Sequence, residues 1–145
     1  IPQSTVIAVQ EAIYSGDGQR IQKLIHDLLL QSVSCFDTVG ENFYHGFMLG
    51  LCTMLSGSYT TSNREAGEGR YDIQIMPKTP ALPGILIELK TEKHCSQEKL
   101  GQLAKVALEQ INDRKYETDM MARGVSAIFK YGVALSGKNV AVAVG

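Results

Sequence analysis

Glu88 and Lys90 have the residue types and the spacing of a hydrolytic site. They alternate with apolar residues in the segment 85–90. If this segment is a β-strand, Glu88 and Lys90 project from one face and Ile85, Ile87 and Leu89 from the other. A carboxylate and an ammonium group at the end of an apolar strand are costly to bury unless they are paired or bound to a metal ion.

A second carboxylate, Asp72, lies in the preceding predicted strand, residues 70–76. If the two strands form a hairpin, Asp72 can lie beside Glu88, where two like charges repel each other. A divalent cation removes this repulsion, and hard oxygen ligands favour Mg²⁺ or Mn²⁺ over zinc. Lys90 could then orient or deprotonate a bound water that attacks a phosphoryl group. The alternative is an ordinary ion pair between Glu88 and Lys90, because a Glu-x-Lys triplet arises readily by chance.

The elements that must position these residues follow from hydrophobic periodicity. Apolar residues recur at helical spacing in 4–34, with a break at residues 16–18, and again in 96–116. Thr38 and Glu41 have the spacing of a capping box, which predicts a third helix that ends near Gly57. Strand-like composition is found in residues 59–63, 70–76, 85–90, 127–135 and 140–144. This order predicts an α/β fold in which helices flank a mixed sheet.

The length of 145 residues fits one compact unit, with an N-terminal helical extension (1–36) packed on a core (37–145). The chain opens without Met and ends after an apolar run, so we expect a fragment of a longer protein. No apolar run is long enough to cross a bilayer, and the first residues do not form a signal peptide. We therefore expect an intracellular protein, in the cytoplasm or nucleus, with no membrane partner. Three widely spaced cysteines predict reduced thiols rather than a zinc site or disulfides.

Four stretches together carry a resemblance to a known family: residues 41–47, 62–73, 85–90 and 107–111, the last followed by Tyr116. They resemble the PD-(D/E)xK nuclease superfamily, and in particular a family of domains found C-terminal to AAA-like ATPase modules. The similarity extends from about residue 13 to residue 144. It implies a restriction-endonuclease-like α-β-β-β-α-β core with extra N-terminal helices. The Pro that names the superfamily is absent before Asp72, where Arg70 and Tyr71 stand.

The resemblance also implies a role for each matching residue. Asp72 and Glu88 would be metal ligands and Lys90 the catalytic lysine. Glu41 would complete the metal site from the first core helix, although a capping box explains a glutamate there equally well. Further side chains would be accessory or contact phosphate, and each can also be an ordinary structural or solvated residue: His45, Arg64, Arg70, Gln110, Arg114 and Tyr116.

We therefore expect a Mg²⁺- or Mn²⁺-dependent nuclease that acts on DNA or RNA. The resemblance suggests an AAA-like ATPase domain in the same full-length chain and a homodimer as further partners. The net charge of −1 and the pI near 6.3 do not indicate a basic nucleic-acid-binding surface. They favour the alternative, a catalytically inactive nuclease-fold module that binds nucleic acid or protein. A thiol enzyme based on Cys95 and His94 is a third hypothesis, although sequence neighbours rarely form a nucleophile–base pair.

Overall fold

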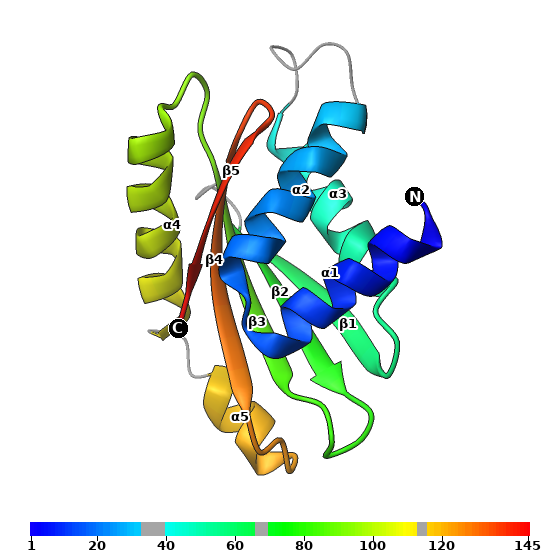
Figure 1. Cartoon of the computed structure of the whole chain (residues 1–145). Helices are drawn as coiled ribbons and strands as arrows, with labels where there is room; N and C mark the ends of the chain where they lie inside the picture. The colour runs from blue at the N-terminus through cyan, green and yellow to red at the C-terminus, as the bar shows by residue number, and fades with distance from the viewer. Residues whose placement is uncertain (33–39, 66–69, 113–115) are drawn as a thin grey trace.

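The computed structural model describes residues 1–32, 40–65, 70–112 and 116–145, without the side chains of residues 32, 41, 63–65, 70–72, 112 and 116. A five-stranded mixed sheet lies between helices on both of its faces (Figure 1). The predicted α/β class with a helix-flanked mixed sheet is confirmed, and the arrangement is consistent with a restriction-endonuclease-like fold. None of the helices in the described ranges is long and apolar enough to span a bilayer.

The sheet is a meander of three antiparallel strands extended by a parallel strand and an antiparallel edge strand. The strands, in spatial as well as chain order, are β1 (Ser58–Glu65), β2 (Arg70–Pro77), β3 (Gly84–Thr91), β4 (Ile128–Ser136) and β5 (Asn139–Val144). β1, β2 and β3 pair antiparallel, β4 pairs parallel with β3, and β5 pairs antiparallel with β4. A parallel pair requires a crossover connection, which here contains two helices.

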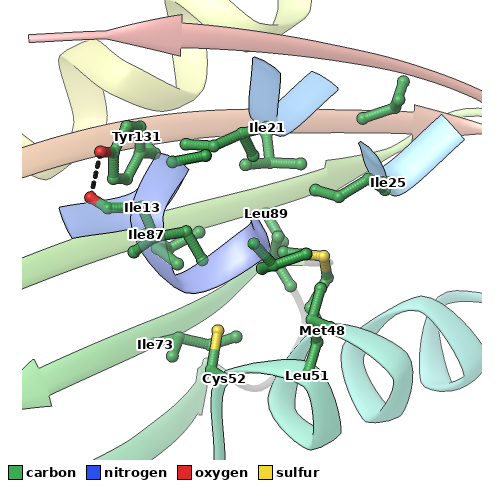
Figure 2. Close-up of a cluster of buried hydrophobic side chains, with 14 of the residues drawn as sticks. Ile13, Ile21, Ile25, Met48, Leu51, Cys52, Ile73, Ile87, Leu89 and Tyr131 are labelled. Atoms are coloured by element: carbon green, nitrogen blue, oxygen red, sulfur yellow. Dashed lines mark hydrogen bonds between the residues drawn. The ribbon is translucent and has the colours of Figure 1, made fainter. Parts of the chain in front are cut away.

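Three helices cover one face of the sheet: α1 (Gln3–Ser15), α2 (Gly18–Ser32) and α3 (Glu41–Thr53) (Figure 1). Gly16, with φ 77°, ends α1 in a left-handed conformation at the break that the sequence predicted. Apolar side chains from all three helices join one core with the sheet (Figure 2). Within this core the buried Tyr131 hydroxyl of β4 donates a hydrogen bond to the carbonyl of Ile13 in α1.

The ends of α3 differ from the sequence prediction. The N-cap residue is Gly40 rather than Thr38 and makes no side-chain cap hydrogen bond, and the side chain of Glu41, the other member of the predicted capping box, is not among those described. Thr38 itself lies outside the described residues. The helix ends at Thr53 rather than near Gly57. Gly57 instead adopts φ 83° in the turn that leads into β1, a conformation that glycine adopts without strain.

The crossover helices α4 (Gln97–Asn112) and α5 (Tyr116–Ala122) lie on the opposite side of the sheet from α1–α3 (Figure 1). α4 packs on β3, β4 and β5. α5 was not predicted, because a seven-residue helix in which Met120 is the one described side chain that is buried gives no readable period. An ion pair of 2.6 Å between Lys130 Nζ of β4 and Glu117 Oε2 joins α5 to the sheet.

The side chains of β3 alternate between these two helical layers. Ile85, Ile87 and Leu89 belong to the core formed with α1–α3. Leu86 belongs to a separate cluster on the side of α4 and α5, which contains Ile111 and Met120. Because strand side chains alternate, Glu88 and Lys90 project on the same side as Leu86, toward the layer of α4 and α5.

Candidate active site

Glu88 is a carboxylate in the interior of the protein. Only 1% of the residue is exposed, and apart from Ser136 the other fully buried residues in the described part of the chain are apolar or glycine. Its Oε1 atom makes no hydrogen bond of its own, while the residue as a whole has an interaction partner. Burial of a carboxylate lowers stability unless other charges or hydrogen bonds compensate.

Asp72 is the direct cross-strand partner of Glu88. The register of β2 and β3 places their Cα atoms opposite each other, and the flanking pair of Ile73 with Ile87 agrees with this register. Lys90 follows two residues later on the face of Glu88 and is half-buried. The hairpin on which the predicted Asp72–Glu88 pair depends therefore exists. The side chain of Asp72 lies outside the described set.

Gly132 allows α4 to lie directly against the sheet beside Glu88. It is the partner of Glu88 in the parallel β3–β4 ladder. A Cβ atom at this position would lie 2.1 Å from the backbone oxygen of Ala104 and 2.6 Å from the backbone nitrogen of Leu108. Our sequence analysis missed this residue, although an isolated glycine inside a strand pattern is a recognised signal of close backbone approach.

Glu88 lies at a border on its face of the sheet. On one side α4 covers β3, β4 and β5. On the other side β1 and β2 carry exposed or half-buried residues, among them Tyr59, Thr61 and Gln74. α4 therefore covers the sheet on one side of Glu88, and the exposed and half-buried residues of β1 and β2 lie on the other side.

Gln110 lies on α4, in the helical layer toward which the side chain of Glu88 projects. It is half-buried, and its Oε1 atom is buried without a hydrogen bond. An amide oxygen in that state can accept a hydrogen bond from water or from a bound molecule. Two of the predicted accessory residues, His45 and Gln110, have a described side chain. Gln110 is the one that lies on α4, the helix that packs beside Glu88.

Glu41 and His45 lie on α3, which packs against the opposite face of the sheet. Glu41 is the first residue of this helix, and its side chain is outside the described set. His45 is half-buried, with a buried Nε2 atom, and has an interaction partner.

The other predicted phosphate contacts are placed by their backbone alone. Arg64 and Arg70 lie at the adjoining ends of β1 and β2, the same end of the sheet at which β3 finishes. Tyr116 is the first residue of α5, and Arg114 lies outside the described residues. Asn63, which we did not predict, is the partner of Asp72 in β1, so one row across the sheet contains Asn63, Asp72 and Glu88.

The described side chains include only part of the predicted metal site. Among the described side chains no group of three His, Cys, Asp or Glu residues is placed to hold a metal ion. The two carboxylates predicted to act with Glu88, those of Asp72 and Glu41, are not among those side chains.

The structure gives no support to a thiol nucleophile at Cys95. The Cys95 thiol lies 3.8 Å from Glu92 Oε2, to which it donates a hydrogen bond. Burial, followed by the negative charge of Glu92, raises the pKa of Cys95. A nucleophilic cysteine requires a lowered pKa, because the thiolate is the reactive form. Cys52 and Cys95 are buried and form no disulfide with another described residue, and Cys35 lies outside the described residues.

Comparison with known families agrees with this arrangement of strands and charges. The family model for the PD-(D/E)XK nuclease superfamily matches residues 39–144. The match includes α3, all five described strands and both crossover helices, and so contains Asp72, Glu88 and Lys90. No curated protein matches the chain. Because the family model covers most of its length, the chain belongs to the PD-(D/E)XK nuclease superfamily.

Proposed function

We propose that this chain is a divalent-metal-dependent nuclease that hydrolyses phosphodiester bonds of DNA or RNA. The observation that carries the proposal is the direct pairing of Asp72 with the buried Glu88, with Lys90 following on the same face. A buried carboxylate opposite a second acidic residue is unfavourable in a purely structural role. Membership of the PD-(D/E)XK superfamily supports nuclease-type chemistry at these residues.

The donor set fits a hard divalent cation. Directly paired residues of an antiparallel ladder have Cβ atoms about 5 Å apart on one face, so the carboxylates of Asp72 and Glu88 can share one cation. Carboxylate oxygens are the ligands that Mg²⁺ and Mn²⁺ prefer. Such a cation stabilises charge on a phosphoryl group and lowers the pKa of a bound water. Glu41, at the start of α3, is the third candidate ligand that the family resemblance implies.

The protein's own groups would position the reactants. Lys90, half-buried near the end of β3, would hold its ammonium group against the phosphate or orient the attacking water. Gln110 would accept a hydrogen bond through its buried Oε1 atom. The close contact of α4 at Gly132 would keep water from the far side of Glu88 and fix the position of this carboxylate.

A cleavage assay with matched lysine variants tests the proposal. Labelled single- and double-stranded DNA and RNA are incubated with Mg²⁺, with Mn²⁺ or with EDTA. Lys90→Ala should lower the cleavage rate by about 10²–10⁴-fold, the range for a positioned proton-transfer group. Glu88→Gln should abolish the cleavage that Mg²⁺ or Mn²⁺ supports. Lys93→Ala is the control, because Lys93 is exposed and makes no ion pair with any described residue. Equal losses in Lys90→Ala and Lys93→Ala would contradict a specific role for Lys90.

The second candidate function is a catalytically inactive module that binds nucleic acid or protein. The net charge of −1 favours it, because proteins that grip nucleic acid mainly through phosphate contacts are usually basic. Binding without cleavage of any substrate at millimolar metal would establish this function in place of the first. As partners we propose, besides nucleic acid, an AAA-like ATPase domain in the same full-length intracellular chain and a second copy of this chain. Light scattering of the purified domain tests the last of these.

A further inference from the structure

We infer that the sheet face formed by β1 and β2, beside the proposed nuclease site, is a platform for single-stranded nucleic acid on which Tyr59 stacks against a base. We define the platform as the side of β1 and β2 that carries Tyr59, Thr61 and Gln74. The inference rests on the proposed nuclease function, because it assigns the path of the substrate strand to the face that carries Glu88 and Lys90.

The side on which Tyr59 projects follows from its neighbours in β1. Thr60 Oγ1 donates a hydrogen bond of 3.2 Å to the carbonyl of Cys52 in α3, so Thr60 faces the layer of α1–α3. Tyr59 and Thr61 therefore project to the other side. The register agrees, since Tyr59 pairs with Met76, which packs against the cluster on the side of α4 and α5.

The aromatic ring of Tyr59 is exposed to solvent. It is 63% exposed, the highest value among the large hydrophobic residues in the described part of the chain. Lys78 Nζ lies 4.7 Å from the centroid of the ring. The backbone N–H of Lys78 donates a hydrogen bond of 2.8 Å to the carbonyl of Gly57, which ties the ends of β1 and β2 together. The ammonium group lies over one face of the ring, so a base would stack on the other face while the ammonium group supplies a charge for its phosphate.

Apart from Met76, the described remainder of the platform is polar, and it carries no described negative charge. Thr61 is exposed and Gln74 is half-buried, and the two are cross-strand partners. Among the strand residues whose side chains the structure describes on this face, Glu88 is the one carboxylate. A phosphate backbone that crosses the platform therefore meets hydroxyl and amide groups until it reaches the proposed metal site.

The distance from Tyr59 to the site fits a short stretch of nucleotides. Asn63 stands in the row of Asp72 and Glu88, four residues beyond Tyr59 in the same strand. At about 3.3 Å per residue the distance along β1 is about 13 Å, and two strand spacings of about 4.8 Å lead from β1 to Glu88 in β3, so Tyr59 and Glu88 are about 16 Å apart. Stacked bases rise by about 3.4 Å each, so the base on Tyr59 would lie about five nucleotides from the cleaved bond, and fewer if the strand is extended.

The chemistry of the platform favours a single strand over a duplex. Bases in a duplex present their faces to one another, so an aromatic ring on a flat sheet can stack only on an unpaired base. Duplex binding depends chiefly on many phosphate contacts with basic residues, and this chain has a net charge of −1. Stacking supplies affinity that does not depend on a basic surface.

The sequence offers a direct spectroscopic test, because the chain contains no tryptophan. Tyr59→Trp introduces a single tryptophan, whose selectively excited emission is quenched when a base stacks on it. The control is Ile7→Trp, at a 50% exposed position of α1 on the other side of the sheet. In EDTA, oligothymidylate and oligouridylate should quench Tyr59→Trp saturably and leave Ile7→Trp unchanged. A blunt-ended duplex should quench far less, and a preference between the two oligonucleotides would show whether DNA or RNA is bound.

Substitutions at the same positions give a second readout. Tyr59→Ala should weaken single-strand binding by about 5- to 150-fold, as expected from stacking energies, and should raise KM while kcat stays nearly constant. Tyr59→Phe should retain the wild-type values. Lys78→Gln should reduce the salt dependence of binding by about one phosphate contact.

The outcomes separate this inference from the nuclease proposal. If the wild-type protein cleaves nucleic acid but Tyr59→Trp is not quenched and Tyr59→Ala has an unchanged KM, the platform inference is wrong and the nuclease proposal holds. If Tyr59→Trp is quenched but no substrate is cleaved, the platform stands and the nuclease is wrong. Equal quenching by duplex overturns the preference for single strands. A tryptophan signal that depends on protein concentration alone would identify a second copy as the occupant and overturn the inference.

Discussion

Gly132→Ala tests whether the close contact of α4 with the sheet holds the site together. The added Cβ would meet the backbone oxygen of Ala104 at 2.1 Å, whereas ordinary contact begins at 3.4 Å. The helix must therefore move by about 1.3 Å, because backbone atoms cannot rotate away as a flexible side chain can. We expect a loss of about 1–3 kcal/mol in the free energy of unfolding. We also expect an approximately 10²-fold loss of cleavage, because an error of about 1 Å in the positions of reacting groups has that effect.

Gly101→Ala in the same helix is the matched control. Nothing lies within 4 Å of a Cβ at Gly101, so alanine should stabilise α4 by about 0.5–1 kcal/mol through its higher helix propensity. Urea unfolding followed by circular dichroism gives both free energies, and the cleavage assay gives the activity. A Gly132→Ala protein as stable and as active as Gly101→Ala would refute the reasoning that α4 fixes the position of Glu88.

Three further predictions concern the core that supports the sheet. Tyr131→Phe should lower the free energy of unfolding by about 1–3 kcal/mol in urea titration, because the buried carbonyl of Ile13 loses its hydrogen bond; no change would contradict the pairing. Burial raises the pKa of Cys52 from 9.0 to about 12, so the folded state holds a proton that the unfolded state releases. The contribution of this thiol to the free energy of unfolding should therefore decline as pH rises from about 9 to 12. Cys52→Ala should show a flatter dependence of stability on pH in that interval. Removal of residues 1–36 should prevent cooperative unfolding in calorimetry, because α1 and α2 bury apolar side chains in the same core as the sheet; a folded, cooperative remainder would contradict this.

Much of the fold was readable from the sequence because local pattern and tertiary burial agree. The segment 85–90 alternates between apolar and charged residues after Leu86, and the structure divides it between two helical layers in that order. The end of α3 was misplaced because Gly57 satisfies a positive-φ turn beside β1 rather than a helix cap. A glycine signals a left-handed conformation, but the sequence does not say which turn uses it.

The candidate site was readable only in part. The register of Asp72 with Glu88 could be anticipated as a consequence of one hairpin. The contact at Gly132 could not, because it depends on the parallel placement of β4 beside β3 and on the crossover through α4. The position of Glu41 on a helix that covers the other face also depends on how the layers stack, which a helical period alone does not determine.

The most direct test of the proposed metal site is a calorimetric titration of Mn²⁺ into the wild-type protein and into Asp72→Ala. Asp72 and Glu88 are paired across the β2–β3 hairpin, so loss of either carboxylate should remove much of the affinity for the cation. We predict saturable binding to the wild type and no measurable binding to Asp72→Ala, which should retain the wild-type circular dichroism spectrum. Equal binding to both proteins, or none to the wild type at millimolar Mn²⁺, would contradict the assignment of this pair as the metal site.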